Sequence, residues 1–407
     1  MNMNDFYVRN SCRLCKGHDL QLVLPLNKSP LCDAFITKPK HQECYDLNVY
    51  LCNKCSFVQI DTIVDPEIIY RDYIYVTTSS PGLKKHFDSY TSEVCSALKN
   101  KNSKLTVDIG SNDGMLLEYF KKKNHRVLGI EPAIQIAKDA TERGIETLPV
   151  FFDESEAKKI VNKYGNAELI TINNLFANID DLENFTKGLE ILLDNNGIIV
   201  IESSYLLNMI NNMVFDFIYH EHLSYFSILP LIKFFEKYGI KLIRLQKVPT
   251  KGGSLRYYWA REDSNWEVDQ SVKQMIEKEQ KANISFKIFE DFRSRIDYEK
   301  EQLTNFLQAQ TNKTIVGYGA SATSTTLISH FKLNQYLNFL VDDNPGKVGT
   351  YSPGYHIPVY SSAKLQEEPP DVIIILAWRF KEQIINKLSS IRSQIILPLP
   401  SFKELNI

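Results

Sequence analysis

The sequence predicts an α/β protein with a small cysteine-rich N-terminal part and two units of alternating strands and helices. Three observations support this prediction. Two Cys-x-x-Cys pairs fall within residues 1–68, strand-like and helical patterns alternate from 104 to about 248, and a second alternation begins at 314. We therefore place the domain boundaries at 1–68, 69–250 and 251–407.

The composition bounds the class of protein. The chain has 407 residues, 43% hydrophobic and 24% charged, which is typical of a globular protein with two or three domains. Its 47 Lys and Arg nearly balance 49 Asp and Glu, whereas nucleic-acid binding needs a basic surplus. No apolar run approaches the ~20 residues of a membrane span, and the start lacks a secretion signal. We expect a cytoplasmic monomer with neither a nucleic acid nor a membrane as partner.

The N-terminal cysteines indicate a metal site. Zinc takes four soft ligands, and each Cys-x-x-Cys turn can present two thiolates. We predict a structural Zn²⁺ held by Cys12, Cys15, Cys52 and Cys55. Cys32 and Cys44 lack the spacing, so we expect neither to be a ligand. The alternative is four buried cysteines that act as small hydrophobic side chains.

The middle of the chain predicts a parallel, doubly wound sheet. Its strand candidates are 104–110, 126–131, 167–173, 197–202 and 240–246, and helical patterns separate them at 116–123, 133–144 and 182–193. Apolar residues at helical spacing over 265–310 predict one long helix or two. The second unit has strand candidates at 314–320, 337–343, 371–378 and 393–399.

A glycine-rich turn follows the first central strand. Asp108 lies on that strand, Gly110 and Gly114 follow, and Glu131 ends the next strand. Glycines allow a tight turn close to a ligand, and a carboxylate at Glu131 can accept hydrogen bonds from ribose hydroxyls. The loop lacks the three-glycine dinucleotide fingerprint and the lysine of a triphosphate loop, which favours S-adenosylmethionine. An ordinary strand-to-helix turn is the alternative.

The tetrad Tyr219-His220-Glu221-His222, followed by Tyr225, combines a base, a carboxylate and phenols. An extended chain would place Tyr219 and Glu221 on one side and the two histidines on the other. Such a cluster could supply a base near neutral pH and an oxyanion donor. A metal site on the two histidines and a purely structural hydrogen-bonding cluster are the alternatives.

Two features of the last third suggest anion contacts. The segment GYGASAT follows a strand and opens a helix, so Gly317, Gly319 and nearby N–H groups could hold a diphosphate. A nicotinamide site and pure scaffolding are the alternatives. Arg256, in GGSLR, is a second candidate for pairing with phosphate through its forked guanidinium.

Many short motifs occur in a particular order along the chain. They are the Cys-x-x-Cys pairs, YIYVTTSS followed by His86, IGSNDG, IEPA, NNLFANI, YHEHLSYF, GGSLR, GYGASAT and VDDNPGKVGTYSPGYHIPV. In them the chain resembles the sugar C-methyltransferases of deoxysugar pathways, which methylate nucleotide-linked 4-keto-6-deoxyhexoses. The resemblance covers nearly the whole chain.

The resemblance implies a zinc-binding N-terminal domain, a central Rossmann-like S-adenosylmethionine domain and a C-terminal Rossmann-like substrate-binding domain. The sugar nucleotide would lie between the last two, partly covered by the first. Carried over by motif, His222 is the general base with Glu221 and Tyr219 beside it, and Tyr75 reaches the sugar pocket. The cofactor site would include Asp108, Gly110, Asn112, Gly114, Glu131 and Asn174, and the substrate site Tyr225, Asn178, Arg256, Gly317 and Gly319.

The chain departs from the family pattern at three positions. Asn178 and Lys251 stand where histidines are usual, and Thr323 stands where a lysine is usual. The first two bear on hydrogen bonds in the active site. The third bears on the phosphate contact and leaves the carrier open between dTDP and GDP.

The predicted reaction is methylation at carbon 3 of a 4-keto sugar. The ketone acidifies the neighbouring C–H, a base near pH 7 removes the proton, and a donor stabilises the enolate oxygen. His222 would be the base and Tyr219 or Tyr75 the donor. The alternatives are O-methylation of a sugar hydroxyl and a zinc-ribbon binding module.

Overall fold

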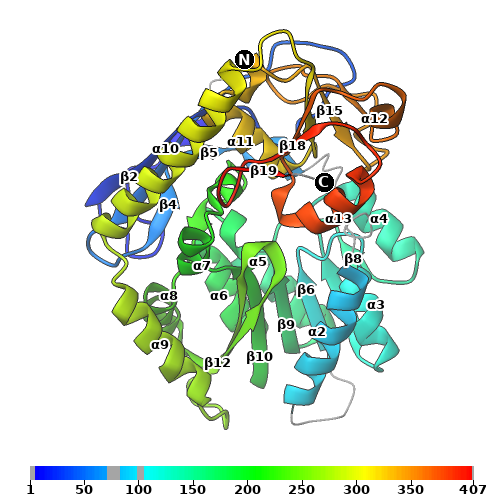
Figure 1. Cartoon of the computed structure of the whole chain (residues 1–407). Helices are drawn as coiled ribbons and strands as arrows, with labels where there is room; N and C mark the ends of the chain where they lie inside the picture. Colours follow the sequence, from blue (N-terminus) through cyan, green and yellow to red (C-terminus); the bar gives the residue numbers. More distant parts are fainter. Residues whose placement is uncertain (1–4, 71–82, 99–104, 406–407) are drawn as a thin grey trace.

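The structure, a computed structural model, describes residues 5–70, 83–98 and 105–405 (Figure 1). Its centre is a seven-stranded sheet in the order β12-β13-β10-β9-β6-β7-β8. Five neighbouring strands pair in parallel, as predicted. They are β6 (Leu105–Ile109), β7 (Arg126–Ile130), β8 (Thr147–Leu148), β9 (Ala167–Asn173) and β10 (Leu193–Ser204).

The other two strands of this sheet differ from the prediction of a wholly parallel sheet. β12 (Ile240–Val248) and β13 (Ser254–Arg261) form an antiparallel hairpin, and β13 also pairs antiparallel with β10. The connection 249–253 is too short for the crossover that parallel strands require. The sheet therefore continues to Arg261, past the boundary expected at 250.

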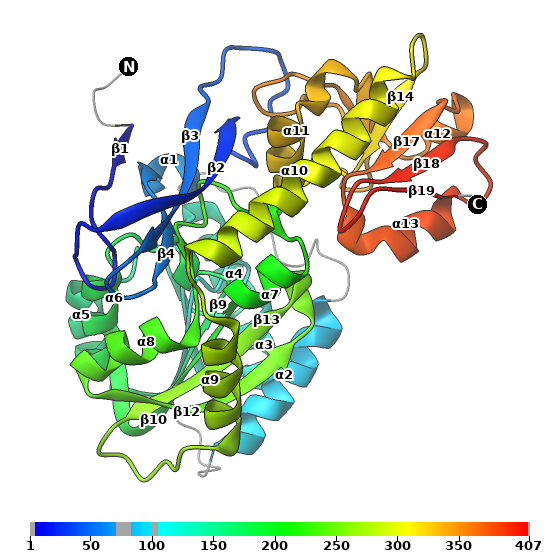
Figure 2. The same cartoon turned by 60° about the vertical axis from the view of Figure 1, so that its left-hand side comes forward.

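Helices cover both faces of the central sheet (Figure 2). On one face α2 (Leu83–Ala97) and α3 (Met115–Lys122) share a core with β9 and β10. On the other face lie α5 (Glu154–Tyr164), α6 (Leu182–Leu192), α8 (Ile228–Phe235) and α9 (Gln270–Ala282). α4 (Ile134–Glu142) connects β7 to β8. The sequence analysis did not anticipate α5 or β8.

The cysteine-rich part forms a four-stranded sheet in the order β11-β4-β3-β2. β2 (Leu20–Ser29), β3 (Tyr45–Cys52) and β4 (Val58–Ile60) come from the N-terminal part. β11 (Ser224–Tyr225) comes from the segment directly after the histidine tetrad and pairs with β4. A separate ribbon joins β1 (Phe6–Val8) to β5 (Thr62–Val64), and α1 (Pro66–Tyr70) follows. The N-terminal sheet therefore holds the tetrad from one side.

Two helices lead into the C-terminal unit. α9 ends at Asn283, whose positive φ of 48° breaks the helix, and α10 (Phe286–Gln308) begins after Ser285. The six-stranded sheet that follows has the order β16-β15-β14-β17-β18-β19. Its strands are β14 (Ile315–Tyr318), β15 (Phe339–Asp342), β16 (Val359–Ser361), β17 (Val372–Ile375), β18 (Gln394–Leu397) and the antiparallel β19 (Lys403–Leu405). The helices of this unit are α11 (Ala322–Phe331), α12 (Lys364–Glu367) and α13 (Lys381–Leu388).

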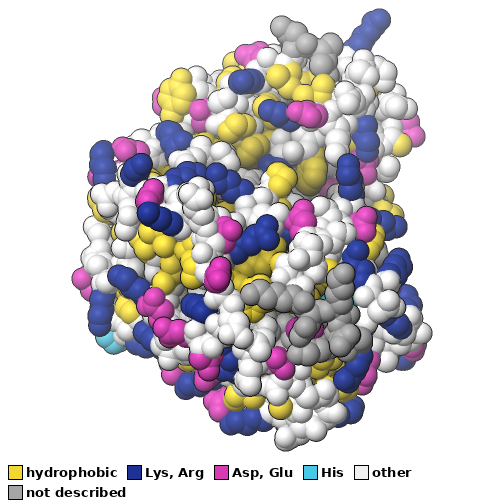
Figure 3. Space-filling model, turned by 90° about the horizontal axis from the view of Figure 1, so that it is seen from below, with side chains coloured by type: hydrophobic (Ala, Val, Ile, Leu, Met, Phe, Trp, Pro, Cys, Tyr) yellow, Lys and Arg dark blue, Asp and Glu magenta, His cyan; other side chains and the backbone are white. Residues whose placement is uncertain are grey.

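Basic and acidic side chains are interspersed over the face of the molecule shown in Figure 3. Among the described residues, no helix is both long and apolar enough to cross a membrane. The apolar core of the C-terminal unit is continuous with that of the N-terminal sheet and of α10.

Candidate active site

A cavity of about 520 Å³ opens at the carboxyl ends of β6, β7 and β9. This edge is where ligands bind in open parallel sheets, because the strand-to-helix loops converge there. Its lining combines the glycine loop, the tetrad and side chains from the N-terminal part. Representative lining residues are Gly110, Glu131, Asn174, His222, Lys251 and Tyr70.

Both glycines of the glycine loop lie in the left-handed region of φ. Gly110 has φ 77°, and a Cβ there would lie 2.9 Å from Leu175 Cδ2. Gly114 has φ 75° directly before α3. A side chain at Gly110 would therefore be strained and would also collide with Leu175. This is the tight turn that the sequence predicted.

Glu131 links the loop to the next strand. One carboxylate oxygen accepts from the N–H of Asn112 at 3.0 Å and the other from the N–H of Ala133 at 2.9 Å. Burial raises the pKa of this carboxyl, and the two N–H groups oppose that rise. The side chain lines the cavity, and its carboxylate oxygens have lone pairs beyond these two bonds for a ligand's hydroxyls.

Asp108 is a buried carboxyl at the foot of the cavity. Burial raises its pKa to about 7, the hydroxyl of Thr171 opposes this from 2.6 Å, and the charge of Glu131 adds to it. Two carboxyl groups with different environments thus stand side by side. The cavity lining also includes Phe152 and Asp153, which follow the unpredicted strand β8.

Asparagine side chains also line the same cavity beyond the loop. Asn178 donates to the hydroxyl of Tyr70 at 2.9 Å. Its Oδ1 and both amide atoms of Asn173 are buried, with no hydrogen-bond partner among the described residues. Asn174 has φ 55°, and its N–H donates to the carbonyl of Glu202. Unsatisfied amide atoms in a cavity wall are the groups that a polar ligand would pair with.

His222 presents one ring nitrogen to the protein and leaves the other as an acceptor. Its Nδ1 lies 2.8 Å from the carbonyl oxygen of Phe217. A carbonyl only accepts, so Nδ1 carries the proton and Nε2 of the neutral ring is the acceptor. Burial lowers the pKa of His222 to about 4, and the charge of Lys251 lowers it further while Phe217 opposes. The ring is therefore neutral at pH 7.

The other tetrad members do not alternate as an extended chain would. Residues 219–222 form a turn closed by the His222 N–H on the Tyr219 carbonyl at 2.9 Å. Tyr219, Glu221 and His222 consequently line one cavity, and the rings of Tyr219 and His222 lie 4.1 Å apart. His220 turns away to the carbonyl of Asp46 at 3.1 Å, which rules against a metal site on the two histidines.

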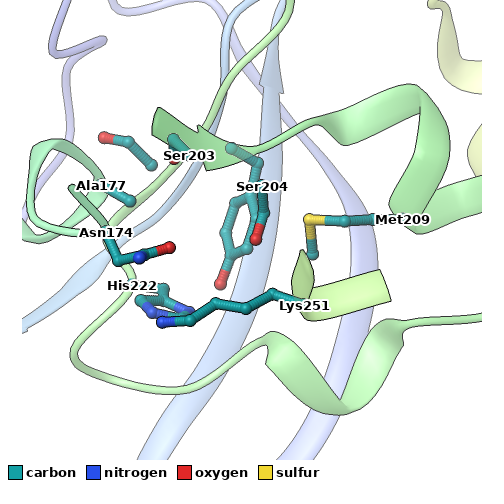
Figure 4. A pocket seen from close by; sticks show the side chains of 9 residues that line it. Asn174, Ala177, Ser203, Ser204, Met209, His222 and Lys251 are labelled. Atoms are coloured by element: carbon teal, nitrogen blue, oxygen red, sulfur yellow. The ribbon is translucent and has the colours of Figure 1, made fainter. Parts of the chain in front are cut away.

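A small recess adjoins the cavity beside His222 (Figure 4). Asn174, Met209, Tyr225 and Lys251 contribute to its lining. In Figure 4 the amino group of Lys251 points toward the His222 ring. Tyr225 is buried, and its hydroxyl has no hydrogen-bond partner in the described part of the chain.

The N-terminal part forms one wall of the cavity. Arg9 and Arg13 pair with Asp180 at 2.8 and 2.9 Å, and the hydroxyl of Tyr7 bonds the same carboxylate. These contacts fasten the cysteine-rich part onto the central unit beside Asn178. Tyr75, expected in the sugar pocket, lies outside the described residues.

Arg256 does not occupy the position that phosphate pairing requires. It is 2% exposed, pairs with Glu202 at 2.8 Å and Glu93 at 2.7 Å, and lies over the ring of Tyr90. Glu202 also bonds His86 at 2.9 Å. The guanidinium is therefore neutralised inside the protein, a role that its sequence context did not reveal.

The second glycine loop is likewise filled by the chain itself. A Cβ on Gly317 would lie 2.6 Å from Leu376, and one on Gly319 would lie 2.5 Å from Ala377. The N–H of Gly319 bonds Val341, and that of Ala320 bonds Asp342 at 2.6 Å. Neither glycine lines the cavity, and both are closely packed by the chain itself. Their predicted diphosphate contact stays a prediction.

The C-terminal unit reaches the base indirectly, through Arg379. This guanidinium bonds both oxygens of the buried Asp216 at 2.8 and 2.9 Å and the hydroxyl of Thr323 at 2.8 Å. It also lies over the ring of Phe217, 4.5 Å from the centroid, and that ring stacks on His222. Thr323, the departure from the family pattern, is thus a partner of Arg379.

Comparisons with known proteins follow the same three parts. A zinc binding domain family matches residues 12–70, a methyltransferase domain family 86–245, and the "C-methyltransferase C-terminal domain" family 249–400. The chain is 28% identical over 403 residues to C-methyltransferase NovU of Streptomyces niveus, covering 96% of each protein. The chain therefore resembles C-methyltransferases over nearly its whole length. It is therefore an enzyme of methyl transfer, as the motif order predicted.

Two solved structures that resemble this C-methyltransferase each cover just under half of its chain. Magnesium protoporphyrin IX methyltransferase of Synechocystis PCC 6803, with bound SAH, is 14% identical at a TM-score of 0.35, covering 44% of this chain and 84% of that one. The PH0226 protein of Pyrococcus horikoshii OT3 is 10% identical at 0.38, covering 48% and 98%. Neither likeness bears on substrate.

The four predicted cysteines of the C-methyltransferase fit a zinc ion. Their sulfur atoms all lie within 4.8 Å of one another, with 3.6 Å from Cys12 to Cys55 and 3.5 Å from Cys15 to Cys52. Tetrahedral Zn–S bonds of about 2.3 Å would separate sulfurs by about 3.8 Å. Cys32 and Cys44 lie outside this cluster, as predicted. None of the four cysteines lines the cavity, which indicates a structural role.

The cavity of the C-methyltransferase also fits S-adenosylmethionine, its predicted cofactor. Glu131 can accept from ribose hydroxyls, the glycine loop allows close backbone approach, and Phe152 offers an apolar face. The unsatisfied amide of Asn173 provides polar atoms for the ligand. When bound, this cofactor supplies an electrophilic methyl group.

Proposed function

We propose that this C-methyltransferase methylates carbon 3 of a nucleotide-linked 4-keto-6-deoxyhexose, with His222 as the general base. The observation that supports this most is the His222–Phe217 hydrogen bond of 2.8 Å. It orients a neutral imidazole in one tautomer, with Nε2 as the acceptor, in the cavity that also contains the glycine loop.

The chemistry of the substrate follows from the base. A neutral imidazole with a lowered pKa removes a proton only from an acidified C–H, which a neighbouring ketone supplies. The C–H bond breaks, the proton goes to Nε2, and the electron pair moves toward the carbonyl oxygen. Carbon 3 then becomes the nucleophile. Tyr219 stays a neutral phenol, because burial raises its pKa well above the usual value, and it packs on the ring of His222.

Deuterium exchange tests this proposal separately from methyl transfer. Incubation in D₂O with a dTDP- or GDP-linked 4-keto-6-deoxysugar should place deuterium at carbon 3, and labelled S-adenosylmethionine should then place label on the same carbon. O-methylation would give label on oxygen with no exchange. Absence of both label and exchange on every keto sugar would refute the proposal.

Two matched histidine variants sharpen the assignment of the base. His222→Asn keeps an N–H that can reach the Phe217 carbonyl but removes Nε2, so exchange should fall by ~10²–10⁴-fold. Cofactor binding, measured by calorimetry, should stay within ~3-fold of the parent. His220→Gln keeps a donor to Asp46 and should retain exchange. An active His222→Asn enzyme would overturn the assignment.

A further inference from the structure

The turn between β12 and β13 places a lysine beside the base. Lys251 has a φ of 52°, in the left-handed region, and sits in the short helix Thr250–Gly252. Gly252 and Gly253 are pressed so closely against the segment 208–214 that a Cβ on either would lie under 3.0 Å from it. This close packing fixes the position of the turn, and the Lys251 side chain lines the cavity.

The side chain of Lys251 is exposed to the cavity. It lines both the large cavity and the small recess, and its amino group points at the His222 ring (Figure 4). Among the described residues it makes no hydrogen bond or ion pair within bonding distance. A cation exposed to a cavity and lacking a bonded anion is available to a ligand.

Charged groups on three other elements face this ammonium. Glu202 of β10 and Glu221 of the tetrad attract it, while Arg379 repels it. Glu202 is already engaged by His86 and Arg256. Desolvation in the cavity wall lowers the pKa of Lys251 to about 8, Arg379 adds to this, and Glu202 and Glu221 oppose it. The charge of Lys251 in turn lowers the pKa of His222. Lys251 is therefore mostly protonated at pH 7, at a position next to the proton acceptor.

We infer that Lys251 is a catalytic residue whose ammonium group binds the substrate's carbonyl oxygen and stabilises the enolate formed by His222. The inference rests on the proposed function. The C–H bond breaks, its proton moves to His222 Nε2, and the carbonyl oxygen takes the negative charge while Lys251 keeps its three protons. Carbon 3 would then take the methyl group from the sulfonium of bound S-adenosylmethionine, whose S–CH₃ bond breaks and leaves its electron pair on sulfur, while the pair on oxygen reforms the carbonyl. A charged donor stabilises an oxyanion more strongly than the neutral phenol of Tyr219.

The charge of Lys251 gives the reaction an alkaline limit. Below pH 8 the amine is protonated and the enolate is stabilised, whereas above pH 8 the ammonium is lost and exchange should slow. Lys251→Arg should move this limit above pH 10, because a guanidinium stays protonated. A merely structural lysine would leave the pH profile unchanged.

Three variants test the inference by the carbon-3 exchange rate. Lys251→Met should slow exchange by ~10²–10³-fold and abolish the limit near pH 8. Lys251→Arg should restore a large part of the rate and shows that the turn still folds. Lys247→Met, on the exposed side of β12, is the matched control and should exchange normally.

The outcomes separate this inference from the proposed function. If the unaltered enzyme exchanges carbon 3 but Lys251→Met does so within ~3-fold and with the same alkaline limit, Lys251 has no catalytic role. If the unaltered enzyme exchanges no keto sugar, the proposed function itself fails. Unchanged cofactor affinity in Lys251→Met, measured by calorimetry, assigns the loss to the chemical step.

Discussion

The two glycine-bearing loops of this C-methyltransferase are similar locally but differ in their surroundings. Both follow the first strand of an α/β unit and open a helix, at Gly110 in the central unit and Gly319 in the C-terminal unit. Each also lies near a carboxylate that ends the next strand and accepts backbone N–H groups, Glu131 or Asp342. The first loop opens onto a cavity of about 520 Å³, and the second is closed by its own chain.

Neighbouring side chains produce the difference. In the C-terminal loop the side chain of Ser321 accepts from the Ser324 N–H and caps α11. α3 begins at Met115, and its N-cap residue Gly114 has no side chain. The Met115 N–H donates to Asp113 Oδ1 at 3.3 Å, and this loop still lines the cavity.

The strand before each loop gives the largest expected contrast. Asp108 precedes Gly110 by two residues, whereas Gly317 holds the same place before Gly319. The folded pKa of Asp108 is raised to about 7, so its burial costs stability progressively as pH rises from about 4 to 7. Between pH 5 and pH 8 the ionisation of Asp108 should lower the parent's free energy of unfolding by about 3 kcal/mol, and Asp108→Asn should not show this decrease. Urea unfolding at the two pH values measures this difference. If the free energy of unfolding changes equally with pH in variant and parent, the raised pKa of Asp108 is contradicted.

Glu131 and Asp342, the carboxylates at the ends of the second strands of the two units, provide a matched pair of variants. Glu131→Ala should weaken S-adenosylmethionine binding by ~10²-fold, about 2.7 kcal/mol, because ribose acceptors are lost. Asp342→Ala should leave that affinity within ~2-fold and lower the free energy of unfolding by about 1–2 kcal/mol, since the Ala320 N–H loses its acceptor. Calorimetry and thermal unfolding separate the two effects. If both variants lose S-adenosylmethionine affinity equally, the claim that only the first loop contributes to the cofactor site is contradicted.

Arg379 gives the C-terminal unit an indirect contact with the base. Arg379→Ala should lower kcat by ~10–30-fold while cofactor affinity stays constant, because Phe217 loses the cation that holds it against His222. Removing one partner of the buried Asp216 pair also costs stability. Arg379→Lys, which keeps the charge, should recover part of kcat. A change in KM for the nucleotide sugar alone would instead indicate direct substrate contact.

Local patterns in the sequence were sufficient for several features. The cysteine spacing predicted the metal cluster, and the alternation of strands and helices predicted the parallel part of the central sheet. The turn at Gly110 also followed from residue type, since only glycine tolerates both its φ and the contact with Leu175. Short strands such as β8 have too few residues to show a period, which is why Phe152 and Asp153 were missed.

Tertiary contacts decided the rest of the site. The sequence suggested a phosphate contact for Arg256, but in the fold this residue pairs with Glu202 and Glu93. The sequence also suggested an extended tetrad, but the tetrad forms a turn and the following β11 pairs with β4. The sequence by itself determined which side chains are available and which local turns they can adopt, because these depend on residue type and spacing. Which charges are already neutralised, and which face an open cavity, depends on partners far along the chain, such as Glu93 for Arg256, and was decided only when the chain folded.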